Sequence, residues 1–194
     1  DPASGEVYSL EMKNQTVHLD LEPAQTIFVV FNNIGGGKKW SPLPTGGKEE
    51  LFVNDWQASL HHSREAWTKT MAMPELKDLK DTEYVNFMGD ITYTATFRAD
   101  GKELPKYLNL GEVHEIAELK LNGKPLGVRW FGNKTYDVSG LVKAGDNVLE
   151  VKVTTLMGNY MQTLKDNKVA ERQVIKRKHP IKSMGLLGPV KLYK

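Results

Sequence analysis

The sequence has no cysteine among its 194 residues. This excludes disulfides, thiolate metal sites and cysteine nucleophiles, because each of them needs a thiol. Long apolar runs are also missing: the longest, Ile27–Phe31, has five residues, whereas a membrane-spanning helix needs about 20. The formal net charge is only +2, which is too small to indicate a nucleic-acid or membrane partner.

Several catalytic motifs are absent as well. The glycine-rich stretches 35–39 and 46–49 lack the Lys-Ser/Thr ending of a phosphate-binding loop, and neither GxSxG nor HExxH occurs. His61 and His62 are the only histidine cluster. Adjacent strand residues point to opposite faces, so we interpret this pair as polar loop or surface residues. The sequence thus predicts no catalytic residues and no cofactor.

Alternation of apolar and polar residues with a period of two is the dominant pattern, and it is typical of half-buried strands. It is clearest at Ile91–Phe97, Ala117–Leu121 and Leu149–Val153. Asn122-Gly123 is a strong hairpin signal, because a type I′ turn needs positive φ at both central residues. No segment keeps a helical period for long, although a short helix fits between Pro74 and Asp81. The pattern predicts an all-β protein, an antiparallel sandwich of the jelly-roll type.

Two domains are expected. Residues 1–33 contain three strand-like runs, read as a short β-meander in which Ile27–Phe31 is a strand buried on both faces. A glycine-rich hinge at residues 32–39 separates them from the jelly roll, residues 34–194. The start, Asp1–Gly5, has neither the basic nor the apolar part of a signal peptide, so we expect the sequence to begin inside a longer gene product.

Tryptophan pairs are the first candidates for a binding site. An indole face stacks on the C–H face of a sugar ring, while the sugar hydroxyls need polar partners. Asp55 with Trp56, and Arg129 with Trp130, fit this chemistry, and Trp67 lies in the same irregular region as Trp56. The alternative is that these tryptophans pack in the core, where large aromatic rings dominate the buried area.

The basic segment Lys165–Lys182 has seven Lys or Arg and two acidic residues, a local charge of 7 − 2 = +5. It could form a patch for an acidic glycan or for a phosphate backbone. No aromatic residue is interleaved, which argues against nucleic acid. We interpret the segment first as a solvated loop or edge strand that lysines keep soluble.

The second half of the sequence resembles a known domain. The stretches that carry the resemblance are Asn86–Phe97, Leu108–Val113, Ala117–Gly127 with Trp130, Tyr136–Ser139, Gly145–Val151 and Gly185–Val190. In this order they resemble the galactose-binding-like jelly roll of large glycoside hydrolases, in the β-galactosidase/β-glucuronidase family (family 2) and the family 106 rhamnosidases. The rhamnosidase type is the closer match, because Leu19–Pro23 and Phe28–Phe31 resemble strands that end its preceding sandwich.

The resemblance implies an accessory module, since the catalytic carboxylates of such enzymes lie in a separate (β/α)₈ barrel that this sequence does not contain. Its partners would be carbohydrate or the parent enzyme's catalytic domain, and the location secreted or periplasmic. A structural calcium is implied too, with Asp90, Asp137 and Asn147 as available ligands. Met88-Gly89 and Thr155–Tyr160 depart from the family pattern; Asn159 and Tyr160 complete the candidate carbohydrate ligands.

Two alternatives belong to other classes. One is a free-standing small glycoside hydrolase whose carboxylate pair comes from loops 40–90 and 155–185, with one pKa raised. The other is a surface interaction or adhesion domain that uses the basic segment. Within the accessory reading, a binding module should expose at least two aromatic side chains on one loop face, whereas a purely structural module should bury all four tryptophans.

Overall fold

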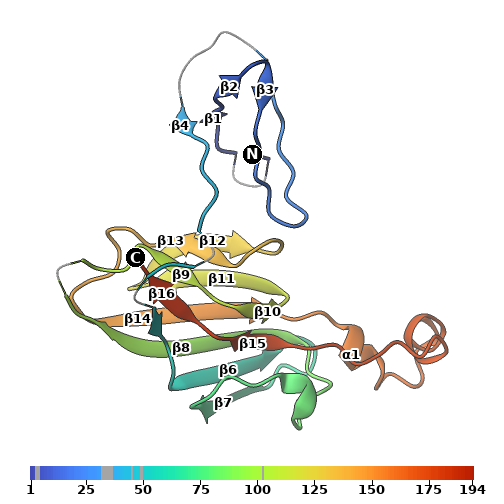
Figure 1. Ribbon diagram of the computed structural model, residues 1–194. Coiled ribbons are helices and arrows are strands. Elements are labelled where there is room, and N and C mark those ends of the chain that lie inside the picture. The colour runs from blue at the N-terminus through green and yellow to red at the C-terminus, as the bar shows by residue number, and fades with distance from the viewer. Residues whose placement is uncertain (3–4, 32–36, 45, 49, 102) are drawn as a thin grey trace.

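The computed structural model describes residues 1–2, 5–31, 37–44, 46–48, 50–101 and 103–194, and its main body is a sandwich of antiparallel sheets (Figure 1). The larger sheet has six strands. In spatial order they are β12 (Lys124–Arg129), β11 (Ile116–Leu121), β14 (Gly145–Thr154), β8 (Gly89–Ala99), β6 (Trp56–His62) and β7 (Thr68–Met73). Every neighbouring pair in this sheet is antiparallel.

The opposite layer is built from shorter strands. Four of them form one sheet in the order β13 (Thr135–Asp137), β9 (Tyr107–Asn109), β16 (Lys191–Tyr193) and β5 (Leu51–Phe52). Beside it, β10 (Glu112–His114) pairs with β15 (Gly185–Gly188). The prediction of an all-β antiparallel sandwich is confirmed.

The core lies between these layers and follows from the alternation in the sequence. On β8, Ile91, Tyr93 and Ala95 are buried while the threonines between them are partly exposed. Leu149, Val151 and Val153 of β14 are buried in the same way. Each large apolar side chain removed from water contributes about 1.5–3 kcal/mol, so this inward-facing set supplies most of the driving force for folding.

The hairpin between β11 and β12 forms where the sequence predicts it. Asn122 and Gly123 both have positive φ, at 52° and 78°. Turns of this kind twist with the flanking strands and fix their register. The loop that follows β12 is therefore placed at the edge of the larger sheet, beside β13.

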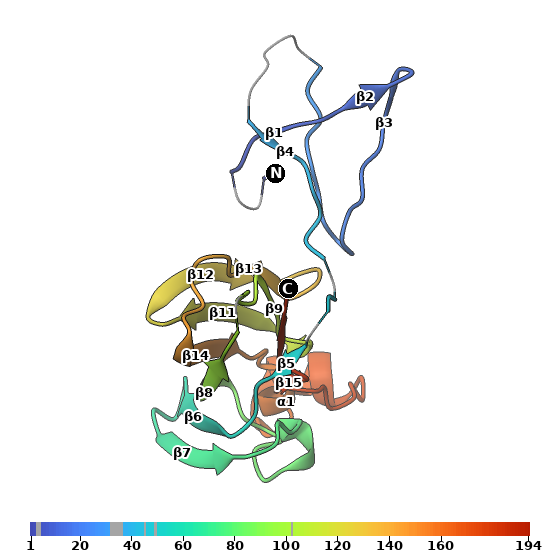
Figure 2. The ribbon, with the colours of Figure 1, turned by 60° about the vertical axis from the view of Figure 1, so that its left-hand side comes forward.

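The N-terminal residues form a separate small lobe above the sandwich (Figures 1 and 2). In it, β1 (Tyr8–Ser9) pairs in parallel with β4 (Lys38–Lys39), and β2 (Met12–Lys13) forms a hairpin with β3 (Thr16–Val17). The predicted domain division at residues 33/34 stays a prediction, because β1 and β4 lie on either side of it. The predicted hinge falls largely on residues 32–36, outside the described residues.

The prediction of a fully buried strand at Ile27–Phe31 is wrong. These residues form no strand, and Phe28 and Phe31 are 75% and 81% exposed. A strand needs a hydrogen-bonded neighbour, and a buried one needs a layer over each face. In the described part of the chain, this run has no paired strand, and it does not have a layer over each of its faces.

Helical structure is short. A 3₁₀ helix, η1 (Leu79–Asp81), lies where the sequence allows a helix, and α1 (Gly158–Met161) follows β14. The basic segment, expected as a loop or edge strand, instead contains α2 (Lys168–Ala170) and the π-helical η2 (Glu171–Ile175). In the described residues, no helix has the length and apolar character that crossing a membrane requires.

Candidate functional site

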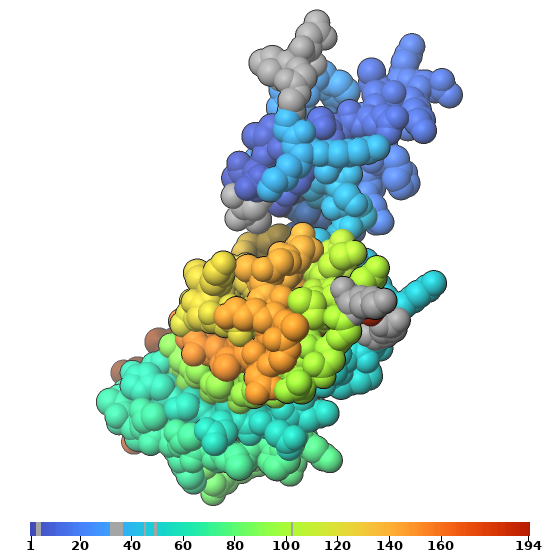
Figure 3. All heavy atoms as spheres, turned by 90° about the vertical axis from the view of Figure 1, so that its left-hand side faces the viewer, coloured from blue at the N-terminus to red at the C-terminus, as the bar shows by residue number. Residues whose placement is uncertain are grey.

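The loop between β12 and β13, residues 130–134, lies where the N-terminal lobe meets the sandwich. Figure 3 shows the lobe above the yellow and orange surface around β12 and β13. Trp130 in this loop is 64% exposed, and the neighbouring Phe131 ring stands edge-on to it, with ring centroids 4.8 Å apart. The exposed indole can stack on a sugar ring.

Glu22 of the lobe fixes this loop. One carboxylate oxygen accepts the backbone N–H of Asn133 at 3.1 Å and lies 3.9 Å from the guanidinium of Arg129. Gly132 has φ of +62°, and a Cβ there would collide with the Glu22 carboxylate. A side chain there would displace the carboxylate from the Asn133 amide, and the positive φ itself favours glycine.

Two cationic residues, Arg129 and Lys134, flank the loop in the sequence. The Arg129 guanidinium lies 5.3 Å from the centroid of the Tyr136 ring. Lys134 is only 9% exposed, and its ammonium makes no hydrogen bond or ion pair among the described residues. Burial lowers the pKa of Lys134, which the nearby carboxylate of Glu115 partly opposes. An aromatic face beside hydrogen-bond donors is an arrangement that can hold a sugar ring and its hydroxyls.

Replacing Glu22 by alanine should loosen this loop. The Asn133 amide would lose its acceptor and Arg129 its carboxylate, at a cost of about 1–3 kcal/mol to the local structure. Amide hydrogen exchange is expected to become faster at Asn133, and to stay unchanged in β8. Glu11→Ala is the matched control, since Glu11 forms an exposed pair with Lys39. Unchanged exchange at Asn133 would contradict the role given to Glu22.

A second cluster brings Trp67 and Tyr160 together. The indole N–H of Trp67 donates to Glu65 at 2.9 Å, and the Tyr160 hydroxyl donates to the other oxygen of the same carboxylate at 3.3 Å. Both rings lie 5.1 Å from the ring of His62. His62 is buried and its Nδ1 accepts the backbone N–H of Glu65. The predicted residues Trp67 and Tyr160 are thus neighbours, and their polar groups are bonded within this cluster.

Asn159 has its polar atoms satisfied within the chain. Its side-chain nitrogen donates to the carbonyl of Lys182 at 2.8 Å, and its oxygen accepts the N–H of Lys182 at 2.9 Å. The side chain is 3% exposed. Asn159 therefore closes the base of the basic segment rather than facing a ligand.

Trp56 requires a correction. It is 2% exposed, its indole N–H donates to the Val53 carbonyl at 3.2 Å, and its ring stands edge-on to Tyr93. A ring enclosed on all sides cannot stack on a sugar, so Trp56 belongs to the core. Asp55 is exposed with φ of +57°, in the turn before β6. The structure does not join either residue to the β12–β13 loop.

The implied calcium ligands do not come together. Asp90 and Asn147 lie at opposite ends of the β8–β14 ladder. The side chain of Asn147 is buried and bonded to Asn122 and to backbone atoms, and Asp137 accepts the N–H of Ser139. In the described residues no group of three His, Cys, Asp or Glu is placed to hold a metal. These residues do not fit a calcium site.

Three acids in the first of the loops proposed for a hydrolase have a lowered pKa. The hydrogen bond from Trp67 lowers the pKa of Glu65, and one from Tyr84 lowers that of Glu83. Burial alone would raise the pKa of Asp78, but backbone hydrogen bonds from Lys80 and Met184 lower it. None of the three is the raised-pKa acid that a loop-borne catalytic pair needs.

Sequence patterns missed Glu22, Phe131, Lys134 and Glu65. Glu22 stands in a predicted turn, and its partners Arg129 and Asn133 are more than 100 residues away. No local period carries such a long-range contact. The aromatic neighbour of Trp130 was the one local signal available.

Comparisons with known proteins agree with this fold. No family model matches the sequence. Over 77 residues the chain is 46% identical to a Formosa agariphila protein named "Putative beta-glucuronidase". The matched region covers 38% of this chain and 7% of that protein. A solved rhamnosidase from Novosphingobium sp. PP1Y matches 80% of this chain and 16% of its own, with a TM-score of 0.59 and 24% identity.

A solved β-glucuronidase from Lactobacillus rhamnosus aligns with 59% of this chain over 22% of its own length, at 21% identity and a TM-score of 0.45. The chain spans less than a fifth of the curated relative and of the rhamnosidase. The resemblance expected from the sequence is confirmed for the fold: this sandwich is similar to one part of much larger proteins.

Proposed function

We propose that this chain is a non-catalytic accessory module of a secreted or periplasmic glycoside hydrolase that acts on polysaccharides, of the rhamnosidase type. It docks on the parent enzyme's catalytic domain and presents carbohydrate through the β12–β13 loop. The observation that carries the proposal is the match of 80% of this chain to only 16% of a rhamnosidase. The shared sequence with a protein named as a β-glucuronidase supports the same class.

The β12–β13 loop favours binding over a purely structural role. A purely structural module should bury all four tryptophans, yet Trp130 is 64% exposed. The partly exposed Phe131 stands beside it on the same loop, so two aromatic rings share one loop face. The partly exposed Arg129 adds a donor for sugar hydroxyls.

Titration with oligosaccharides that contain rhamnose or glucuronate should change the tryptophan fluorescence of the chain. The change is expected to disappear in Trp130→Ala, because stacking on the indole supplies the contact. Trp67→Phe is the control. Because Trp67 is bonded to Glu65, its replacement should leave the glycan-induced fluorescence change in place. A fluorescence change that persists in Trp130→Ala, or no change with any glycan, would refute binding through this loop.

A further inference from the structure

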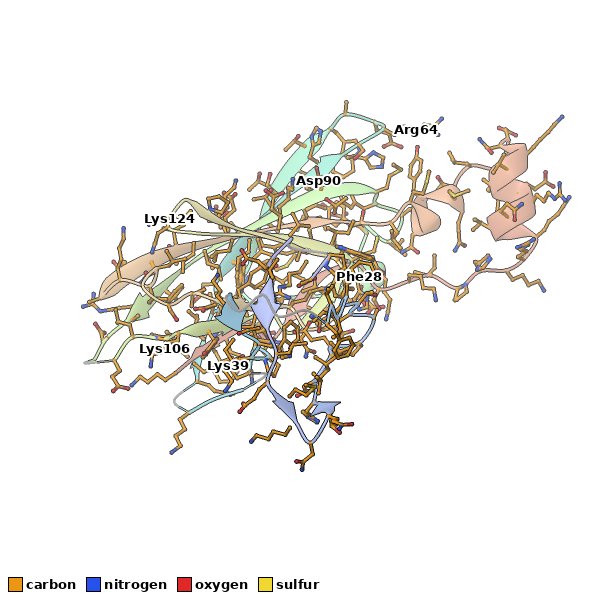
Figure 4. The ribbon with its side chains drawn as sticks, turned by 90° about the horizontal axis from the view of Figure 1, so that it is seen from above. Phe28, Lys39, Arg64, Asp90, Lys106 and Lys124 are labelled. Atoms are coloured by element: carbon orange, nitrogen blue, oxygen red, sulfur yellow. The ribbon has the colours of Figure 1, made fainter. Side chains whose placement is uncertain are left out.

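The basic segment, Lys165–Lys182, protrudes from the sandwich beside α1. Figure 1 shows it reaching away from both sheets, and Figure 4 shows its helical part at the end of the molecule opposite Lys106 and Lys124. Its two ends are held together at the base. Asn159 bonds both backbone groups of Lys182, and Gln162 donates to the carbonyl of His179 at 3.1 Å. The segment is a closed, anchored protrusion.

The interior of the protrusion is ordered by its own contacts. The side chain of Asn167 accepts the N–H groups of Val169 and Ala170 and so caps the start of α2. Ala170 and Val174, four residues apart, are buried on one side of the continuous helix that α2 and η2 form. The other side of this helix faces outward and carries charge.

The charge of the segment is concentrated and largely unpaired. All seven of its Lys and Arg residues are exposed. Among the described residues only Lys176 has an ion-pair partner, Glu171, at 3.0 Å. The segment carries +5 and the whole chain +2, so the remaining residues sum to 2 − 5 = −3. Six unpaired like charges thus stand on one side of an otherwise acidic protein.

Such a cluster repels itself, and a polyanion that brings several negative groups at once relieves this repulsion and releases its own counterions. The segment has no Trp, Tyr or Phe on which a nucleic-acid base could stack. We propose that the basic segment binds an anionic polysaccharide that carries carboxylate or sulfate groups. This inference rests on the proposed function, and adds a second contact remote from Trp130.

Affinity electrophoresis with polygalacturonate and with heparin tests the inference. The triple variant Lys168→Gln, Arg172→Gln, Arg177→Gln should bind about tenfold more weakly than the original chain, because three released counterions are lost. The matched control Lys106→Gln, Lys124→Gln, Lys143→Gln removes the same charge from exposed residues outside the segment. It should stay within about twofold.

Salt and neutral polymers complete the test. Binding should fall steeply with added NaCl, and neutral dextran should not bind. If the triple variant loses its circular dichroism signal, the pair Lys165→Gln, Lys182→Gln, outside both helical stretches, should still weaken binding about threefold. Equal loss in the control variant, equal binding of dextran, or equally tight binding of duplex DNA would overturn the inference.

The two proposals fail independently. Loss of the fluorescence response in Trp130→Ala concerns the β12–β13 loop, and the triple variant of the basic segment should leave that response unchanged. A chain that binds neutral oligosaccharides through Trp130 but ignores polygalacturonate and heparin would keep the proposed function and remove only this inference.

Discussion

Replacing Trp56 by alanine is expected to lower the free energy of unfolding by about 3–5 kcal/mol. The side chain is 2% exposed, lies on β6 in the core between the two layers, and donates its indole N–H to the Val53 carbonyl. Its removal leaves a cavity that the rigid β6–β8 ladder cannot collapse to fill. Urea denaturation followed by far-ultraviolet circular dichroism measures the loss.

Trp130→Ala is the matched control for that prediction. Its indole is 64% exposed, so its removal should change the free energy of unfolding by less than about 0.5 kcal/mol. The two tryptophans should thus be separated by their effects: Trp56 on stability, and Trp130 on the glycan binding proposed for its loop. Equal destabilisation by both variants would contradict the assignment of one to the core and the other to the surface.

Gly89→Ala should destabilise the protein by about 2–5 kcal/mol, from backbone strain together with overpacking. Gly89 begins β8 with φ of +149°, and a Cβ there would collide with the carbonyl of His61 on β6. Its N–H donates to the Thr155 hydroxyl at 3.0 Å, and its carbonyl accepts the N–H of Thr155. The ends of β6, β8 and β14 meet at this residue.

Gly123→Ala is the control that separates the cost of backbone strain from the cost of the steric collision at Gly89. Gly123 also has positive φ, at 78°, but nothing lies within 4 Å of its missing Cβ. That variant should cost only about 1 kcal/mol. Differential scanning calorimetry should show a much larger fall in Tm for Gly89→Ala than for Gly123→Ala. A similar fall for both would mean that the close approach of β6 and β8 matters little.

The sandwich could be predicted because its signals are local. The alternation of Ile91, Tyr93 and Ala95 indicates one buried face, and Asn122-Gly123 indicates the hairpin. Each signal is contained within a few consecutive residues. The apolar run Ile27–Phe31 shows the limit of this reasoning. Its composition predicts burial on both faces, but burial depends on neighbours that the run itself does not encode.

The candidate site was predicted only in part, for the same reason. Arg129 and Trp130 are adjacent in the sequence, so their shared chemistry was visible. Glu22, which fixes their loop, is more than 100 residues away, and Trp67 meets Tyr160 through their shared contacts with Glu65 and His62. The same composition signal at Trp56 marked a core residue, because an indole suits a sugar face and a hydrophobic core equally well.

The central proposal is that this sandwich binds carbohydrate and docks on a catalytic domain but hydrolyses no glycosidic bond itself. The most direct measurement incubates the purified chain with aryl rhamnosides, aryl glucuronides and rhamnose-containing polysaccharides, and follows aryl alcohol and reducing-end release. The account predicts rates equal to those of buffer alone at every pH from 4 to 8. Hydrolysis that rises in proportion to the concentration of the chain would contradict it.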